Sequence, residues 1–173
     1  MVRRVTLAAV IIAACMYPGP GCSRQQRLPH VDLAEANSVG SWAGSVPCHG
    51  KEYCLYVYLA SWCRACRETV PFVHDLRAYY RNSDLVGITV IVGQDRGPAM
   101  QQFAAGVGEM VYIDDGRFAD AAHVRAYPTW ILVARGDSII CKKGAGGIRG
   151  GNQEGRVRYF FEESLGVDWS RFA

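Results

Sequence analysis

The sequence predicts an α/β domain in which helices flank a central mixed β-sheet. From residue 53 onward, strand patterns alternate with helical patterns, which is typical of α/β folds. Two late strand patterns are separated by the Arg-Gly-Asp sequence at 135–137, which predicts a hairpin and an antiparallel edge. Half of the 173 residues are hydrophobic and 20% are charged, so the chain can form a packed core and is not typical of disorder.

The predicted elements follow in a regular order. Segment 53–59 is aromatic and aliphatic throughout, as expected of a buried central strand. Residues 66–81 carry apolar side chains at helical spacing and contain Pro71, which should kink that helix. A proline in the first turn favours a helix over 98–107. The remaining predicted elements are strands at 85–92, 110–113, 129–134 and 138–141, and helices at 117–124 and 152–165.

The N-terminus has the layout of an export signal. Two arginines at positions 3 and 4 precede an apolar stretch, 5–14, which is far shorter than the roughly 20 residues that span a bilayer. The stretch ends in Ile-Ala-Ala followed by Cys15, and this resembles a bacterial lipoprotein signal whose cysteine receives lipid. We therefore predict a signal peptide over 1–15. An ordinary cleaved signal or an uncleaved anchor are the alternatives, and Cys22, close behind Pro20, is a weaker lipidation candidate.

The following segment, 16–47, shows no persistent helix or strand period and is rich in proline, glycine and serine near its start. We predict a tether and a loosely structured entry there, and assign residues 48–173 to the folded domain. The net charge is +3, with both signs scattered along the chain. Because no long basic run is present, nothing indicates nucleic acid as a partner.

Two cysteines stand where the first strong strand pattern gives way to the first helix. In the segment Trp62-Cys63-Arg64-Ala65-Cys66, two intervening residues at a helix start allow both sulfurs to meet in a small ring. The helix N-terminus and nearby arginines should lower the pKa of Cys63 and make it the nucleophile. Cys66 should be the less exposed resolving thiol, which releases a mixed disulfide.

Two other interpretations of this pair remain open. A structural disulfide also fits the spacing. A metal site would need further ligands, and no second Cys or His pair at similar spacing is evident. We therefore expect no metal and no cofactor. A haem attachment is excluded because Arg67, not histidine, follows the second cysteine.

These residues carry a family resemblance that covers roughly 50–165. The segment 59–66 with Pro71 behind it resembles the active-site strand and helix of thioredoxin-like proteins. The sequence Tyr127-Pro128-Thr129 before the strand at 130–133 resembles the cis-proline loop of that family, and the stretch from 112 to 137 is similar to exported reductases of the TlpA/ResA kind. The resemblance implies a thioredoxin-like fold. It also implies an active-site face formed by Trp62, Arg64, Ala65, Tyr127, Pro128 and Thr129.

The sequence departs from the thioredoxin pattern at two places. Val57 occupies the position of a buried acid in the strand before the motif, which removes an expected proton acceptor for the buried thiol. Arg64 and Ala65 replace the usual Gly-Pro between the cysteines, which should affect the redox poise.

The other cysteines suggest a structural role. Cys48 and Cys54 flank a short segment with Gly50 and would form a structural disulfide in an oxidising compartment. A Cys/His metal or accessory redox site is the alternative. Cys141 is expected to be a small buried hydrophobe, and a bond between it and Cys54 would be geometrically awkward in the resembled fold.

The resemblance implies an enzyme, a periplasmic and lipid-anchored thiol–disulfide oxidoreductase that reduces protein disulfides. Its partners would be protein thiol or disulfide clients and a membrane electron donor, because the periplasm is kept oxidising. The alternatives are an oxidase that donates disulfides with the same pair, and a non-catalytic module that binds a metal or a partner protein.

Overall fold

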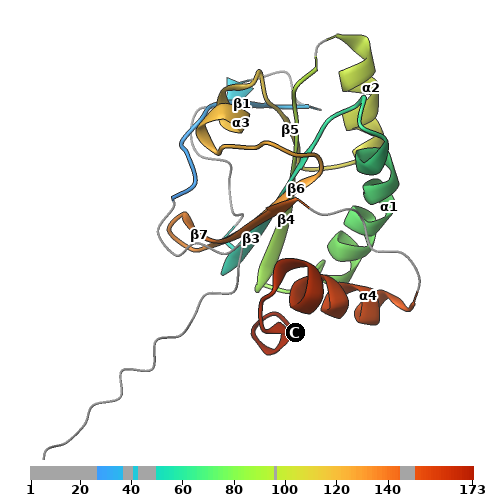
Figure 1. The fold of residues 1–173 in the computed structure, drawn as a ribbon, viewed down its shortest axis with the longest axis vertical. Helices are drawn as coiled ribbons and strands as arrows, with labels where there is room; N and C mark the ends of the chain where they lie inside the picture. Colours follow the sequence, from blue (N-terminus) through green and yellow to red (C-terminus); the bar gives the residue numbers. More distant parts are fainter. Residues whose placement is uncertain (1–26, 37–40, 43–49, 96, 145–150) are drawn as a thin grey trace, which may run out of the picture.

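The computed structural model of the protein describes residues 27–36, 41–42, 50–95, 97–144 and 151–173. The predicted signal peptide and its Cys15 lie outside these residues. Within the described part, one seven-stranded sheet has the order β2-β1-β5-β4-β3-β6-β7 (Figure 1). The strands are β1 (Leu33–Glu35), β2 (Ser41–Trp42), β3 (Tyr53–Leu59), β4 (Val86–Val92), β5 (Val111–Ile113), β6 (Thr129–Ala134) and β7 (Ser138–Gly144).

The sheet is mixed, as predicted. Strands β3, β4 and β5 run parallel to one another, while β6 pairs antiparallel with β3 and β7 pairs antiparallel with β6. The two central strands, β3 and β4, are buried along their whole length, which explains why their sequences are continuously apolar. The predicted hairpin joins β6 to β7, where Gly136 and Asp137 both adopt positive φ angles.

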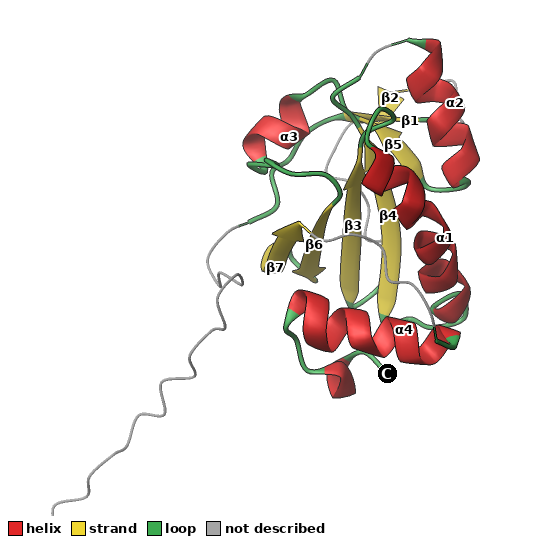
Figure 2. Ribbon diagram, turned by 45° about the vertical axis from the view of Figure 1, so that its right-hand side comes forward, coloured by secondary structure: helices red, strands yellow, loops and turns green. Residues whose placement is uncertain are grey.

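Helices cover both faces of the sheet (Figure 2). One face packs against α1 (Arg64–Tyr79), α2 (Pro98–Val107) and α4 (Gln153–Tyr159), and the other against α3 (Arg117–Ala121). The side chains of β3 are buried alternately in two hydrophobic cores, one on each face of the sheet, because successive side chains of a strand point to opposite faces. Leu55 and Val57 belong to the core beneath α1, whereas Tyr56 and Tyr58 belong to the core beneath α3.

The prediction of a loosely structured entry over 16–47 was wrong for its described part. Strand β1 pairs antiparallel with β5, and β2 pairs antiparallel with β1. Leu28 and Leu33 are buried in the core beneath α3. The domain therefore begins before residue 48. Strands of two and three residues are too short to show a period in the sequence. β1 is held by its pairing with β5, and β2 by its pairing with β1.

The helix ends also differ from the prediction. Helix α1 begins at Arg64, two residues before the predicted start, and it ends at Tyr79. The predicted last helix divides into α4 and a π-helical turn, η1 (Phe160–Leu165), and a short 3₁₀-helix, η2 (Trp169–Arg171), follows it. Within this segment Tyr159 is 54% exposed, whereas its neighbours Phe160 and Phe161 are buried.

Candidate active site

Cys63 lies at the N-terminal cap of α1, just beyond the end of β3. Its sulfur accepts a hydrogen bond from the backbone N–H of Cys66 at 3.1 Å. The first N–H groups of a helix have no intrahelical partner, so the sulfur satisfies one of them and lies at the positive end of the helix dipole. Cys63 is 8% exposed and Cys66 is fully buried. The structure therefore gives the two thiols the unequal access that was predicted for a nucleophile and a resolving thiol.

Burial also separates the two thiols chemically. The pKa of Cys66 is raised to about 12, first by desolvation and then by its hydrogen bond with Cys63, while the nearby Arg67 guanidinium acts in the opposite direction. A thiol with such a pKa remains protonated near neutral pH.

The Tyr127-Pro128 peptide bond is cis, as the resemblance implied. The Tyr127 carbonyl faces the active cysteine and accepts from the Cys63 thiol at a donor–acceptor distance of 3.7 Å. Thr129 begins β6 and donates its hydroxyl hydrogen to the carbonyl of Ala126 at 2.6 Å, so it holds the loop from the far side. Segments 63 and 127–129, separated by more than 60 positions in the sequence, meet at this point.

The rim of the site is formed by exposed side chains. Trp62 is 57% exposed, packs edge-on against the Tyr127 ring, and donates its indole N–H to the carbonyl of Gln94 at 3.2 Å. Arg64 and Ala65 are exposed, and the Arg64 guanidinium pairs with Glu68 along the helix surface. Of the six residues predicted for the active-site face, Trp62, Arg64 and Ala65 adjoin the cysteines in the chain and Tyr127 contacts Cys63. Pro128 and Thr129, which follow Tyr127, are buried.

The sequence analysis missed a polar group behind the site. Tyr58, fully buried in β3, donates its hydroxyl hydrogen to Asp114 at 2.7 Å. Asp114 follows β5 and is itself 1% exposed. The sequence signals for this contact were one of three tyrosines in a buried strand and an acid before a short helix, and neither indicates that the two meet.

Comparison with known proteins supports the fold. No protein-family model and no curated protein sequence matches the chain. Among solved structures, the thioredoxin domain of a thiol-disulfide oxidoreductase from Bacteroides vulgatus is similar with a TM-score of 0.62 and 16% identity, covering 80% of this chain and 97% of that one. A thiol-disulfide oxidoreductase from Bacteroides fragilis gives 0.59 and 18%, covering 78% and 99%.

The exposed lipoprotein thioredoxin of Streptococcus pneumoniae gives a TM-score of 0.57 and 17% identity, covering 78% of this chain and 99% of that one. The chain has a thioredoxin-like fold. The sequence resemblance predicted this fold from residues 59–66 with Pro71, from the cis-proline sequence at 127–129 and from the stretch 112–137. The similarity extends over nearly the whole length of the two Bacteroides proteins. At these identities the similarity concerns the fold, so the chemistry depends on the site described above.

The two other cysteines of the described residues differ from Cys63 and Cys66 in their bonding. Cys54 in β3 and Cys141 in β7 are fully buried and disulfide-bonded, whereas Cys63 and Cys66 are free thiols. Cys141 is thus not the simple buried hydrophobe that was expected. Strand β6 separates Cys54 from Cys141, and their side chains belong to different cores, which speaks against a bond between them. Cys48 lies outside the described residues, so its bond with Cys54 stays a prediction.

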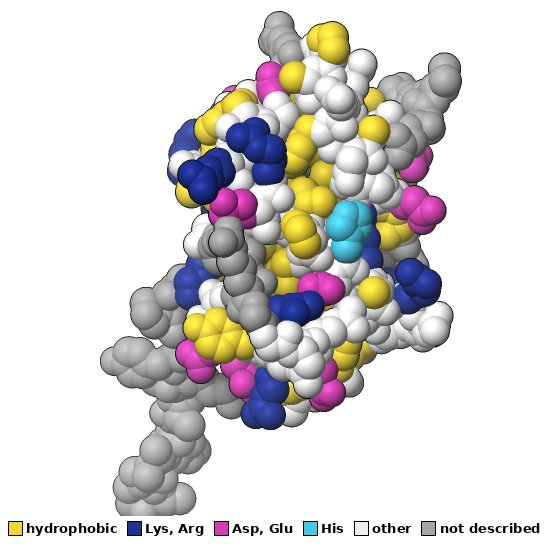
Figure 3. Space-filling view, turned by 90° about the vertical axis from the view of Figure 1, so that its right-hand side faces the viewer, with side chains coloured by type: hydrophobic (Ala, Val, Ile, Leu, Met, Phe, Trp, Pro, Cys, Tyr) yellow, Lys and Arg dark blue, Asp and Glu magenta, His cyan; other side chains and the backbone are white. Residues whose placement is uncertain are grey.

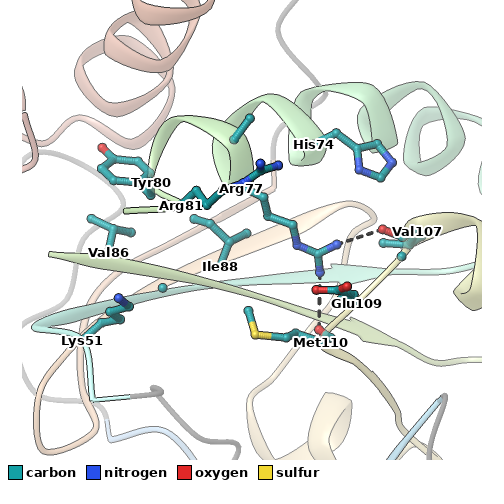
Figure 4. A pocket seen from close by; sticks show the side chains of 13 residues that line it. Lys51, His74, Arg77, Tyr80, Arg81, Val86, Ile88, Val107, Glu109 and Met110 are labelled. Carbon is teal, nitrogen blue, oxygen red and sulfur yellow. Dashed lines mark hydrogen bonds between the residues drawn. The ribbon is translucent and has the colours of Figure 1, made fainter. Parts of the chain in front are cut away.

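A cavity among the described residues lies away from the cysteine pair. It has a volume of about 700 Å³ and lies beside the C-terminal half of α1 and the start of β4 (Figure 4). Arg77 and Lys51 are among the residues that line it. The Arg77 guanidinium donates to the carbonyls of Val107 and Met110, and the Lys51 ammonium group donates to the Ser83 carbonyl. These cations stabilise the fold at this seam, and the cavity does not border the cysteine pair.

The charge pattern and the helices of the described residues add two observations. On the face that carries α1, α2 and α4, basic and acidic side chains are interspersed (Figure 3), in agreement with the scattered charge of the sequence.

In the described part of the chain, no helix combines the length and the apolar character needed to cross a bilayer. Among the same residues, no three His, Cys, Asp or Glu side chains gather as a metal site would require.

Proposed function

We propose that the protein is a thiol–disulfide oxidoreductase that reduces disulfides of protein clients through Cys63 and Cys66. The observation that carries this proposal is the position of Cys63 at the cap of α1, with its sulfur between the Cys66 N–H and the Tyr127 carbonyl. The first contact stabilises a thiolate. The cis-proline loop beside it offers a client chain a backbone edge next to the reacting sulfur.

In the proposed cycle, the Cys63 thiolate attacks one sulfur of the client disulfide, whose S–S bond breaks. One client sulfur leaves as a thiolate and takes up a proton, and the other is held in a mixed disulfide. The Cys66 thiol then gives up its proton and attacks the Cys63 sulfur. The second client thiol is released, and two electrons have passed from the protein dithiol to the client. A membrane electron donor would reduce the Cys63–Cys66 disulfide again.

We further propose that the protein is exported to the periplasm and anchored through lipid on Cys15. The supporting observations are the arginines and the apolar stretch before the Ile-Ala-Ala-Cys sequence, together with the lipoprotein character of the pneumococcal thioredoxin of similar fold. Labelling with a palmitate analogue in a bacterial host tests the anchor. A Cys15→Ala variant that still incorporates the label would contradict it.

The enzymatic proposal is tested by insulin reduction. The parent should reduce insulin with dithiothreitol as the electron source, and Cys63→Ser should fall to the uncatalysed rate. The Cys66→Ser variant should accumulate a mixed disulfide with insulin, because no resolving thiol remains. Equal rates for the parent and Cys63→Ser would remove the enzyme proposal and leave a non-catalytic binding module.

One observation favours a second candidate, an oxidase that donates its disulfide. The N–H contact to Cys63 and the Arg67 charge beside Cys66 both stabilise the reduced, thiolate-bearing form, and such stabilisation makes a disulfide more oxidising. The reduction potential of the pair separates the two directions. A value near the roughly −270 mV of thioredoxin supports the reductase, and a value near the roughly −120 mV of a strong oxidant supports the oxidase.

A further inference from the structure

A single buried carboxylate joins the two halves of the active site. Asp114 accepts hydrogen bonds from the Tyr58 hydroxyl at 2.7 Å, from the Phe118 N–H at 2.9 Å and from the Ala119 N–H at 3.0 Å. Burying a carboxylate is costly unless hydrogen bonds compensate it. These bonds therefore attach the start of α3 to β3, the strand that leads directly into Cys63.

The contact between Tyr58 and Asp114 is tightly enclosed. A Cβ atom on Gly93 would lie 1.9 Å from the Tyr58 hydroxyl oxygen and 3.0 Å from the Asp114 Cβ. Only glycine at position 93 leaves room for the hydroxyl where it now lies. On its other side, the Tyr58 ring stacks on Phe118, with ring centroids 6.1 Å apart and planes 7° apart. The tyrosine is thus held from both sides.

From this pair, contacts continue to the reacting sulfur. The ring of Tyr58 packs against the ring of Tyr127, with centroids 5.8 Å apart. The chain beyond α3 is held by the hydrogen bond from the Val124 N–H to the Ala119 carbonyl at 2.8 Å, and it then enters the cis-proline loop. The Tyr127 carbonyl in turn faces the Cys63 sulfur. Every step in this path is a packed ring or a hydrogen bond among described residues.

We propose that Tyr58 and Asp114 form a positioning unit that holds the Tyr127 carbonyl and the cis-proline loop against the Cys63 sulfur. This inference rests on the proposed function, because it assigns a role in that same site. Both side chains are buried, so neither is open to a client. Without the Tyr58 hydroxyl, Asp114 loses a donor, and the segment from α3 to Pro128 loses one of its attachments to β3. The ring contacts of position 58 and its pairing with Thr129 remain. The loop then shifts from Cys63, and a displacement of about 1 Å can cost up to roughly 100-fold in rate.

Two rates together distinguish a positioning role from a merely structural one: the alkylation of Cys63 by a small reagent and the reduction of a client disulfide. A carbonyl that accepts from a thiol favours the protonated form, so a displaced Tyr127 carbonyl should leave Cys63 more reactive toward a small alkylating agent. A client needs the aligned loop as well as the sulfur, so its reduction should become slower. Loss of stability alone would not move the two rates in opposite directions.

The chain offers a matched control in Tyr80, a buried tyrosine at the far end of α1 whose hydroxyl donates to the Phe172 carbonyl at 2.7 Å. Tyr58→Phe and Tyr80→Phe each remove one hydroxyl with one hydrogen bond of equal length. For Tyr58→Phe we expect kcat/KM for insulin reduction to fall roughly tenfold and Cys63 alkylation by iodoacetamide at pH 7 to become about twofold faster. For Tyr80→Phe we expect both rates to stay at the parent value.

Two further variants keep the test decisive if Tyr58→Phe folds poorly. Gly93→Ala retains the hydroxyl but displaces it and should reproduce the split. The double variant Tyr58→Phe/Asp114→Asn should show no larger effect than the stronger single variant, because both substitutions break the same unit. Additive effects, an unchanged or slower alkylation of Cys63, or equal insulin rates for Tyr58→Phe and Tyr80→Phe would overturn the proposal. If the parent itself does not reduce insulin, the proposed function fails, and the alkylation rates still decide this inference.

Discussion

The two ends of helix α1 differ in the polar groups that they hold and in the partners of those groups. At its N-terminal end, a nearly buried thiol faces a loop carbonyl, an exposed tryptophan lies beside it, and a buried carboxylate supports the loop from behind. At its C-terminal end, Tyr80 donates to the Phe172 carbonyl, and the Arg77 guanidinium donates to the carbonyls of Val107 and Met110. The N-terminal end carries a free thiol that is 8% exposed, whereas most polar groups named at the C-terminal end bond to the backbone of other segments.

The C-terminal end of α1 packs against more aromatic rings than the end that carries the thiols, and we expect it to contribute more to the stability of the fold. The C-terminal end is surrounded by aromatic rings, among them Phe161, which packs against Tyr80, Trp169 and Phe172. Burial of such rings supplies much of the favourable free energy of folding. The N-terminal end of α1 instead carries the exposed Trp62 and the two free thiols, of which Cys66 is fully buried.

The largest effect expected from this division concerns the two thiols. At pH 8, iodoacetamide should label Cys63 in the reduced, folded protein and leave Cys66 unmodified. A pKa of about 12 leaves roughly one Cys66 in ten thousand as thiolate at that pH, and the side chain is also buried. Peptide mapping by mass spectrometry measures the labels, with the urea-unfolded protein as the control in which both react. Equal labelling in the folded state would contradict the assigned order of attack.

Removal of an aromatic ring at the far end should come next in size. Phe161→Ala is expected to lower the free energy of unfolding by about 3–5 kcal/mol, since it deletes a fully buried ring and leaves a cavity. Urea unfolding followed by circular dichroism measures this loss. The alkylation rate of Cys63 under native conditions should remain that of the parent. A changed rate would show that the two ends are not independent.

A smaller loss is expected from the polar seam of the same end. Arg77→Met keeps most of the apolar stem but removes both donors to the Val107 and Met110 carbonyls. We expect the free energy of unfolding to fall by about 1–3 kcal/mol. The loss is limited because the substitution also removes the Arg77 Nε atom, which is buried without a partner among the described residues. Differential scanning calorimetry at fixed pH would measure it. A variant as stable as the parent would show that desolvation of the guanidinium cancels its bonds.

The smallest effect should come from the exposed arginine between the cysteines. The pairing of Arg64 with Glu68 is a surface contact of the i,i+4 type, so Arg64→Ala should change stability by no more than about 0.5 kcal/mol. Glu68→Gln is the matched control, because it breaks the same pair and retains the arginine. If Arg64→Ala shifts the reduction potential while Glu68→Gln does not, the arginine acts on the thiolate and not through its ion pair.

Several features of the fold were predictable because they depend on local pattern. The bounds of β3, α2 and β6 agree with the sequence prediction to the residue, since a continuous apolar run, a first-turn proline and a strand after a proline are all local signals. The Cys63–Cys66 pair at a helix start was recognisable for the same reason. The start of α1 was misplaced by two residues because the cap is formed by the Cys63 sulfur, and cysteine is not a usual capping residue.

Local sequence pattern was enough to predict the order of strands and helices from residue 53 onward, the place of Cys63 at a helix start, and the kind of fold in which such a pair occurs. Tertiary structure alone decided that β1 and β2 join the sheet, that Tyr159 faces solvent, and that Asp114 lies under Tyr58. The physical reason is that these features arise from contacts between distant segments. A two-residue strand or a buried carboxylate is stable only once its partners, which lie elsewhere in the chain, have been brought beside it.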